Sequence, residues 1–543
     1  MWLLLACAPD VSPDSGSAAP EIVDGCDGLD NDGDGTVDED PDRLWWADAD
    51  QDGFGVGAGV ATCMPPDGTA PASGDCDDAD AEVFPGNDET CDGRDNDCDG
   101  LADDGLEALT ASWPDRDADG SGDATAPGYT CGLYAGRVAN DLDCDDADAG
   151  SPVFVAQTGA EGATGGLDTP VVRVAEALAR APRCVWVDDG IWMEDLDLGA
   201  GEVVLRSRHG SAATTLLGTG ATSVLTVTGK QTVDSAIEGF TIVGGSGHVY
   251  TYEGVYNDGT RDYVLHQEER RGGGMLVDGG AGISLRDVQF SGNALPLYEI
   301  DYTGEPTQTE VTVRFGLGGG LYVNHGEADL TDVDFVDNEA AYGAGVGLAG
   351  GVHLTGRRLR FLGNHGNVGP AIMANLAEVD VSNVIIDGTK AAWDAGGIYL
   401  YGVAGKAGSL RLANVTIVDA EAAVITEGTG TVEITNSVIV GNEWGLYDVG
   451  AAVGTPSTWS VRWTDVYGSI TADAFGVAFQ AGLDGNLSVS PNFVSLSLDK
   501  DATNDDLHLG EGSPAVDAGD PDQRDVDGTR ADMGGYGGVG GGW

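Results

Sequence analysis

The chain has 543 residues, which favours more than one domain. It carries 25 Lys and Arg against 91 Asp and Glu, and this net charge of −66 excludes a nucleic-acid surface as the default. Glycine is frequent, at 87 residues, which favours β structure with many turns. Much of the negative charge lies in Asp-rich loops before residue 150. Specific cation binding therefore explains the charge better than the dispersed acidic surface of a high-salt habitat.

The first residues predict export. Leu4-Leu5-Ala6-Cys7 resembles a bacterial lipobox, in which the cysteine becomes lipidated and forms the new N-terminus. The resemblance implies a surface lipoprotein anchored through Cys7 in the outer membrane or at the cell surface; a plain export signal followed by secretion is the alternative. We expect residues 1–23 to be a signal and a flexible tether. Contact with a membrane is expected only through the lipid, because no stretch is long and apolar enough to span a bilayer.

Residues 24–150 form an acidic module with an internal duplication at an offset near 65–68. The runs that begin at Cys26, Trp46 and Asp75 are repeated from Cys91, Trp113 and Asp143. Four loops of the module share the pattern Asp-x-Asp-x-Asp-Gly. Their aspartates are Asp30, Asp32 and Asp34; Asp48, Asp50 and Asp52; Asp95, Asp97 and Asp99; and Asp115, Asp117 and Asp119.

This spacing suits calcium, which takes roughly six to eight oxygen ligands from a loop that wraps around it. Alternate residues of such a loop converge on one point, and the glycine allows the sharp bend. The second loop has Val56 at loop position nine and is less complete, whereas the other three add Asp38, Asp103 and Asp123. No loop is an EF-hand, because position twelve holds no glutamate. Further candidate ligands lie in the repeated run, at Asp75, Asp77, Asp78, Asp80, Asp143, Asp145, Asp146 and Asp148.

The stretch from Asp75 to Asp104 resembles the MopE-type metal-binding repeat, which is named after a methanotroph surface copper-binding protein. The Asp-rich loops also resemble thrombospondin type-3 calcium repeats. The name of the first family implies copper as the alternative cofactor. Copper favours imidazole and soft sulfur, yet the module contains no histidine. We therefore expect oxygen-only sites that bind calcium.

Cysteine usage indicates an oxidising compartment. The spacing predicts three local disulfides, Cys63–Cys76, Cys91–Cys98 and Cys131–Cys144. Cys26 has Gly33 where its duplicate has a cysteine partner, so we expect it to be unpaired. Cys184 is expected to be a small buried hydrophobic residue of a strand.

Residues 151–543 are organised by a repeated phrase, an alternating strand followed by a small polar corner. Examples are Val-Gln-Phe-Ser-Gly-Asn at 288–293, Val-Asp-Phe-Val-Asp-Asn at 333–338 and Leu-Arg-Phe-Leu-Gly-Asn at 359–364. The alternation indicates strands with one buried face, and Gly, Asn and Asp supply the turns. One coil cannot bury its inner face alone, so the phrase predicts stacked coils, with an antiparallel sandwich as the alternative. The segment resembles the right-handed parallel β-helix of the pectin-lyase-like superfamily, which makes the chain mostly β.

A short helix is expected over 171–181, where it would cap the open end of the coils. Two insertions, at about 246–271 and 295–315, follow equivalent corners of neighbouring coils and should lie side by side. Their tyrosines could form a sugar-binding shelf; two packed β-hairpins without a ligand are the alternative. The candidate ligand-binding residues are Tyr250, Tyr252, Tyr256, Tyr263, Tyr298 and Tyr302.

Two functions fit this sequence. The first is a non-enzymatic calcium-binding surface lipoprotein, an adhesin or carbohydrate-binding protein whose partner is an extracellular glycan or cell surface. The second is a polysaccharide lyase or glycoside hydrolase, and the fold alone does not decide between them. The resemblance implies that a hydrolase of this fold would carry clustered, inward-facing aspartates on adjacent coils. The aligned strand positions here hold Gln289, Asp334, Arg360 and Ile385, so the sequence favours the first function and names no catalytic residue.

Overall fold

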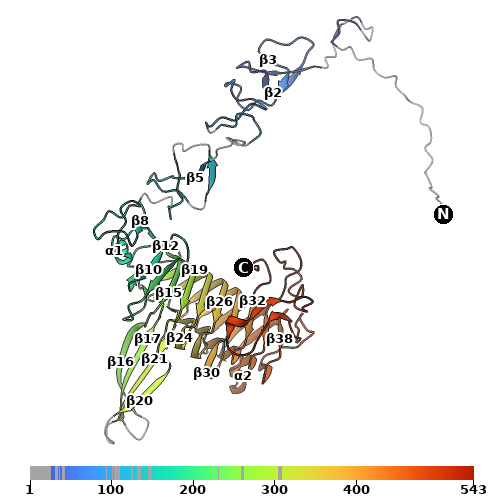
Figure 1. Ribbon diagram of the computed structural model, residues 1–543. Helices are drawn as coiled ribbons and strands as arrows, with labels where there is room; N and C mark the ends of the chain where they lie inside the picture. Colours follow the sequence, from blue (N-terminus) through green and yellow to red (C-terminus); the bar gives the residue numbers. More distant parts are fainter. Residues whose placement is uncertain are drawn as a thin grey trace, which may run out of the picture. The chain divides into compact units, whose positions relative to one another are not determined.

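The computed structural model describes residues 26–30, 35, 37–38, 43–92, 94–100, 102, 110–123, 126–130, 136–144, 150–229, 231–257, 262–303 and 309–542. The chain divides into two compact units, residues 1–118 with 122–141 and residues 119–121 with 142–543. Within the described ranges, no helix is both long and apolar enough to cross a membrane. The expected fold class, a mostly β chain with a right-handed parallel β-helix after a loop-rich Asp-rich module, is confirmed (Figure 1).

The first unit consists of loops around short strands. One sheet has the order β3-β1-β2-β4 and another the order β6-β5-β7. The strands are β1 (Leu44–Ala47), β2 (Phe54–Ala61), β3 (Thr69–Ala70), β4 (Ala72–Ser73), β5 (Thr110–Pro114), β6 (Gly128–Thr130) and β7 (Arg137–Val138). Among the described residues of this unit, only Ala70 and Val83 are buried apolar side chains. The rings of Phe54 and Phe84 stack with centroids 5.5 Å apart. This core is too small to stabilise the unit by apolar burial alone.

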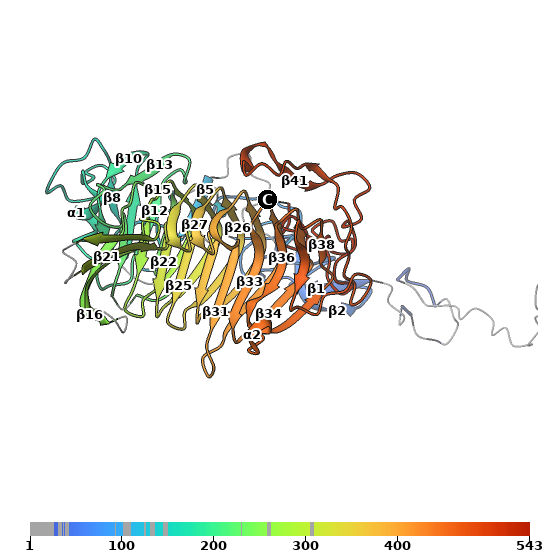
Figure 2. The same cartoon turned by 90° about the horizontal axis from the view of Figure 1, so that it is seen from below.

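The second unit is a stack of coils whose strands form three sheets (Figure 2). The first sheet contains β8 (Val153–Val155), β9 (Cys184–Val187), β10 (Gly190–Met193), β12 (Val204–Ser207), β13 (Thr214–Leu217), β15 (Ala236–Val243), β19 (Gly282–Ser291), β23 (Glu327–Val336), β26 (His353–Leu362), β29 (Glu378–Asp387), β32 (Gly408–Val418), β34 (Gly430–Thr435), β35 (Val438–Val440), β37 (Thr458–Arg462) and β38 (Asp465–Tyr467). The second sheet contains β11 (Leu196–Asp197), β14 (Leu225–Val227), β18 (Met275–Val277), β22 (Leu321–Asn324), β25 (Val346–Ala349), β28 (Ile372–Asn375), β31 (Ile398–Gly402), β33 (Ala422–Gly428), β36 (Trp444–Asp448) and β39 (Ala472–Phe475). Successive coils pair in parallel in both sheets, so the antiparallel sandwich is excluded.

The third sheet includes the two insertions. It contains β16 (His248–Asn257), β17 (Asp262–Arg271), β20 (Glu299–Thr303), β21 (Thr309–Leu317), β24 (Glu339–Tyr342), β27 (His365–Val368) and β30 (Lys390–Ala395). The β16–β17 and β20–β21 pairs are antiparallel hairpins, and β17 pairs in parallel with β21. The insertions therefore lie side by side, as the phrase alignment predicts (Figure 1).

The interior of the β-helix repeats from coil to coil. Phe290, Phe335 and Phe361 are fully buried and stack at centroid distances of 5.1 and 4.8 Å. At the corner that follows these strands, the backbone N–H of Asn293 donates to the Asn338 side chain at 3.1 Å. The N–H of Asn338 donates in turn to Asn364 at 3.0 Å. Each buried corner is thus hydrogen-bonded by the next coil, so the asparagines set the stacking register.

The helix at the start of the coils is shorter than expected. It spans α1 (Val174–Leu178) instead of 171–181. Its first two backbone N–H groups, on Val174 and Ala175, donate to the Glu194 carboxylate at 2.9 and 3.0 Å. Val174 and Ala177 are fully buried against the first coils. A second short helix, α2 (Val449–Val453), is capped by Asp448.

The C-terminal segment covers the outer face of the first sheet. It includes the antiparallel pair β40 (Phe493–Ser495) and β41 (Asp506–Leu509) and the 3-10 helix η1 (Ala502–Asn504). Asn383 donates to the carbonyls of Gly535 and Gly537 at 3.0 and 2.7 Å. Met533 packs with Ile385 and Val418 in a core on this outer face. The first part of the glycine-rich tail, through Gly537, is therefore part of the packed fold.

Candidate functional sites

A carboxylate cluster forms around the second Asp loop. Oxygens of Asp48, Asp50 and Asp52 lie within 4.8 Å of one another. Asp78 joins this loop, because it accepts a hydrogen bond of 2.8 Å from the backbone N–H of Ala49. The pairing of β2 with β4 brings in the segment that follows β4, which contains Asp75 and Asp78. Loop position nine holds Val56, as the sequence analysis notes, and the neighbouring segment brings the Asp78 carboxylate to the start of the loop.

The cluster has oxygens without hydrogen-bond partners. One carboxylate oxygen of each of Asp50, Asp52 and Asp75 is buried and receives no hydrogen bond. Asp75 itself is only 8% exposed. Burial and the negative charges of the surrounding aspartates raise the pKa of Asp50 and of Asp75. Unpartnered anionic oxygens that face one another fit a hard cation, which would supply the missing charge.

The third Asp loop forms a second cluster, with a ligand that sequence reasoning missed. Oxygens of Glu89, Asp95 and Asp97 lie within 4.8 Å of one another. Glu89 is held in place because it accepts the N–H of Asn96 at 2.7 Å and that of Asp97 at 3.1 Å. Burial raises the pKa of Asp97, and so do the charges of Asp99, Glu89 and Asp95. A carboxylate upstream of a period-two loop gives no signal in the loop pattern itself.

The other predicted metal ligands differ in the groups that they contact. Oxygens of Asp115, Asp117 and Asp119 lie within 4.8 Å of one another in their own loop. In the first loop, Asp30 accepts the N–H of Gly35, and Asp38 accepts the N–H of Gly28. Asp80 pairs with Arg94, and Asp123 lies 3.5 Å from Arg116. Asp143 is buried, and the backbone N–H of Asp77 donates to Asp75. The predicted sites at Cys7, Asp32, Asp34, Asp103, Cys131, Asp145, Asp146 and Asp148 lie outside the described residues.

The predicted disulfide partners were wrong. The pairs are Cys26–Cys63, Cys76–Cys98 and Cys144–Cys184, with Cα distances of 5.1, 5.7 and 5.6 Å. Cys91 is also disulfide-bonded. Cys63 cannot reach Cys76, because β4 pairs with the start of β2 while Cys63 follows the end of β2. Cys26 is therefore not unpaired, and Cys184 is a disulfide residue instead of a free hydrophobe.

The chemistry of these clusters distinguishes calcium from copper. Every side chain in the two clusters is a carboxylate, and the nearby thiols of Cys76 and Cys98 are oxidised. Hard oxygen donors suit calcium, whereas copper prefers nitrogen and soft sulfur. The residues therefore fit calcium and do not fit copper.

The first sheet shows the row of residues that the phrase alignment predicts. Gln289 pairs with Asp334, Asp334 with Arg360, and Arg360 with Ile385. Two nitrogens of the Arg360 guanidinium donate to the Asp334 carboxylate. The bond from Nε to Oδ1 is 2.7 Å long. The isolated charges elsewhere on this face are also paired: Arg358 contacts Asp332, and Arg411 lies 3.5 Å from Asp380. This row holds no pair of carboxylates for hydrolysis.

The hairpin tyrosines share a face but do not form one compact site. Strand register places Tyr250, Tyr252, Tyr263 and Tyr302 on the same side of the third sheet. Tyr252 and Tyr302 lie on β16 and β20, three strand spacings or roughly 14 Å apart. Tyr250 donates to Asp278 at 3.0 Å, and the Arg271 guanidinium lies 4.2 Å from its ring. Tyr298 stacks on Phe315, and the side chain of Tyr256 lies outside the described residues.

Comparison with known proteins agrees with the sequence motif. Residues 10–39 and 75–104 match the copper-binding MopE family model, described as a "Putative metal-binding motif". The second match covers the Glu89 cluster and confirms the resemblance over 75–104. The first match begins inside the segment expected to be a tether.

A search of curated proteins found no match. Similar solved structures include the pectin methylesterase from Aspergillus niger, at 12% identity over 61% of this chain and 91% of that chain, with a TM-score of 0.27. Pectate lyase Pel9A is 14% identical over 71% of this chain and 96% of that chain, with a TM-score of 0.32.

Proposed function

We propose that the acidic module binds calcium and becomes ordered when it does so. The observation that carries this proposal is the set of buried, unpartnered carboxylate oxygens on Asp50, Asp52 and Asp75, since Asp50 and Asp52 cluster with Asp48 and their charges act on Asp75. Without a cation these groups repel one another in a region with little apolar core, so ion binding and folding are coupled. The carboxylates would hold the ion, and the ion would supply the charge that offsets their repulsion.

The proposal extends to the whole protein as an exported surface lipoprotein, anchored through Cys7, whose β-helix binds an extracellular glycan. The disulfides support an oxidising compartment. The paired charges of the first sheet support binding over catalysis, because Asp334 is already held by Arg360. A polysaccharide lyase or glycoside hydrolase is the alternative. Release of new reducing ends or unsaturated products from a glycan would favour that alternative.

Calcium titration of the full-length chain tests the metal site. We expect dissociation constants of about 10⁻⁴ to 10⁻³ M, as in extracellular calcium modules. Asp75→Asn should weaken one class of sites by about tenfold, because it removes a buried anionic ligand. Asp67→Asn is the matched control, since Asp67 is exposed and lies in the same segment. Isothermal titration calorimetry measures both, and limited proteolysis in calcium or chelator reports the ordering.

Three results would count against the proposal. Copper could bind the chain while calcium does not. Proteolysis within residues 24–150 could be the same in calcium and in chelator. Asp75→Asn could bind calcium with the same affinity as the wild type and Asp67→Asn. Any of these would show that the carboxylates are a solvated surface or a site for another ion.

A further inference from the structure

The outer side of the second sheet carries a column of mostly large apolar and aromatic residues. Strand pairing aligns Leu276, Tyr322, Gly347, Met373, Tyr399, Ile425, Tyr447 and Phe475 in successive coils. Their strand neighbours, such as Ile398 and Leu400 beside Tyr399, lie in the interior core. The column therefore faces away from the core, toward the outside of the coil.

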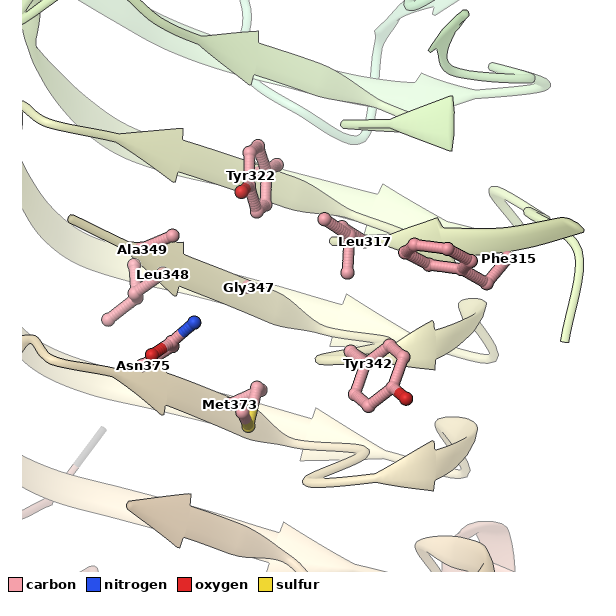
Figure 3. A pocket seen from close by; sticks show the side chains of 9 residues that line it. All are labelled: Phe315, Leu317, Tyr322, Tyr342, Gly347, Leu348, Ala349, Met373 and Asn375. Atoms are coloured by element: carbon pink, nitrogen blue, oxygen red, sulfur yellow. The ribbon is translucent and has the colours of Figure 1, made fainter. Parts of the chain in front are cut away.

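Two cavities lie along this column and share Tyr342, Met373 and Asn375. The first has a volume of about 240 Å³ and is lined by Phe315, Tyr322 and other residues shown in Figure 3. The second has a volume of about 710 Å³ and continues past Tyr399 and Tyr401 to Trp444 and Tyr447. The two cavities adjoin at these three shared residues, and we name them together the aromatic groove. It runs across the strands, parallel to the β-helix axis.

Aromatic rings are gathered at both ends of the groove. At one end, Phe315 lies 6.1 Å from Tyr298 and 6.0 Å from Tyr342, centroid to centroid. At the other end, Trp444 stacks on Tyr447 at 4.8 Å. Gly347 keeps the space beside Tyr322 open, because an added Cβ would lie 3.0 Å from the tyrosine ring. From Tyr322 to Tyr447 the column spans five coil steps, or roughly 24 Å.

The polar groups of the groove determine which ligands it can accept. Among the described residues that line the two cavities, Glu427 is the one that carries a charge, and the Tyr399 hydroxyl donates to it. The described lining residues include no Lys, Arg or His, and the chain carries a net charge of −66. The Arg271 guanidinium lies 5.6 Å from the Tyr322 ring, but it is already paired with Glu269. An anionic polymer would therefore meet repulsion without a paired cation. Asn375 and Glu427 can instead exchange hydrogen bonds with hydroxyl groups.

We propose that the aromatic groove binds an unbranched, uncharged glycan that lies along the β-helix axis. This proposal rests on the proposed glycan-binding function and specifies its site and its ligand class. Sugar rings present apolar faces that pack on aromatic rings and hydroxyl edges that reach Asn375 and Glu427. The strands under the groove are paired on both sides, so they offer no free edge for a peptide strand.

Binding of oligosaccharides to the full-length chain in calcium tests the proposal. The probes are hexasaccharides of β-linked glucose, mannose and xylose, their trisaccharides, and oligogalacturonate as the anionic comparison. We expect one neutral hexasaccharide to bind most tightly, and its trisaccharide to bind about tenfold more weakly because it contacts fewer rings. Tyr401→Ala and Trp444→Ala should each weaken binding about tenfold, since both remove a ring from the groove.

Matched variants separate the groove from the rest of the molecule. Tyr401→Phe keeps the ring and should bind within about twofold of wild type. Tyr252→Ala removes an exposed hairpin tyrosine, 61% exposed, and should also leave binding unchanged. Thermal unfolding of each variant identifies any loss that comes from misfolding, and sedimentation shows whether the groove instead pairs two copies of the chain.

The outcomes distinguish the two proposals. If no glycan binds, both the glycan-binding function and the groove proposal fail. If a glycan binds but Tyr401→Ala and Trp444→Ala bind it as the wild type does, the groove proposal alone fails. The groove proposal alone also fails if Tyr252→Ala abolishes binding, if oligogalacturonate is the preferred ligand, or if a second copy of the chain occupies the groove.

Discussion

The acidic module and the β-helix obtain their stability from different sources. In the β-helix, Phe290, Phe335 and Phe361 are fully buried and stacked, and each corner is hydrogen-bonded by the next coil. In the module, the described buried apolar residues are Ala70 and Val83, whereas Asp75 is a buried carboxylate with an unpartnered oxygen. The first region is stabilised by its own packed side chains. The second has disulfides, and our proposal adds a cation.

This difference allows one chain to combine a region whose stability does not depend on calcium with a region whose stability is proposed to depend on it. Apolar burial does not depend on a bound cation, so the β-helix should be insensitive to calcium. Carboxylate clusters are stable only when their charge is neutralised, so the module should respond to it. The effect of a change in the module should therefore depend on calcium, and the effect of a change in the β-helix should not.

The largest effect is expected from Phe335→Ala. The change leaves a cavity between Phe290 and Phe361 and should lower the free energy of unfolding of the β-helix by about 3–5 kcal/mol. Guanidinium unfolding followed by far-ultraviolet circular dichroism measures it. The loss should be the same in calcium and in chelator. Tyr302→Ala, at a residue that is 67% exposed, is the control and should change stability little. If the loss of free energy of unfolding differs between calcium and chelator, the stability of the β-helix also depends on calcium, and the distinction between the two regions fails.

The β-helix could be predicted because its signals are local and repeat. Aligning the phrases by their final asparagines gives the register that the hydrogen bonds between Asn293, Asn338 and Asn364 show. The same alignment placed Asp334 beside Arg360, and the structure pairs them. Every coil needs the same corner and the same inward side chain, so one correct phrase predicts all of its neighbours.

The carboxylate clusters could be predicted only in part. A period-two pattern identifies ligands within one loop, and it found Asp48, Asp50 and Asp52. Asp75 and Asp78 reach that loop through strand pairing, which leaves no local pattern. The available signal was the duplication, because the run at Asp75 is repeated at nearly the same offset as the loops.

The disulfides show the same limit of local reasoning. Sequence proximity favoured Cys91–Cys98, yet Cys98 pairs with Cys76. The loop around Asn96 is held by its buried side chain, which accepts the N–H of Thr90 and donates to the carbonyl of Glu82. That arrangement turns Cys98 toward the segment of Asp75. Nearest-neighbour pairing fails wherever a loop folds back on an earlier segment.

The second effect is expected from removing this crosslink by Cys76→Ser with Cys98→Ser. The disulfide closes a loop with a sequence separation of 22, and its loss should destabilise the module by about 3 kcal/mol. The variant should be cut faster by protease and should need more calcium to resist it, since calcium binds only the folded loops. The thermal midpoint of the β-helix should not move. Wild-type protease resistance in chelator would mean that the crosslink contributes nothing to the module.

The smallest effect concerns a carboxylate that the β-helix itself buries. Asp387 is 2% exposed at the end of β29, and one of its oxygens has no hydrogen-bond partner. Burial, followed by the charges of Asp505 and Asp419, raises the pKa of Asp387 to about 7. Lys500 does not relieve this, because its ammonium group bonds to the carbonyls of Thr389 and Asp419 and to Glu421. A proton, instead of a cation, should neutralise this site.

The sign of the effect follows from linkage. Because the folded-state pKa lies above the unfolded value, the folded chain binds the proton more strongly. That stabilisation is fully present below about pH 4 and is lost as the pH rises through 7. Asp387→Asn keeps the shape without the charge, so its stability relative to wild type should increase by about 2 kcal/mol between pH 4 and pH 8. The full shift would give roughly 4 kcal/mol, but relaxation and water entry reduce the cost of a buried charge. Denaturant unfolding across this pH range, in chelator, measures the difference, with the exposed Asp67→Asn as a control. If calcium at pH 8 stabilises the wild-type β-helix but not Asp387→Asn, then this site also takes a cation, and the two regions handle buried charge in the same way.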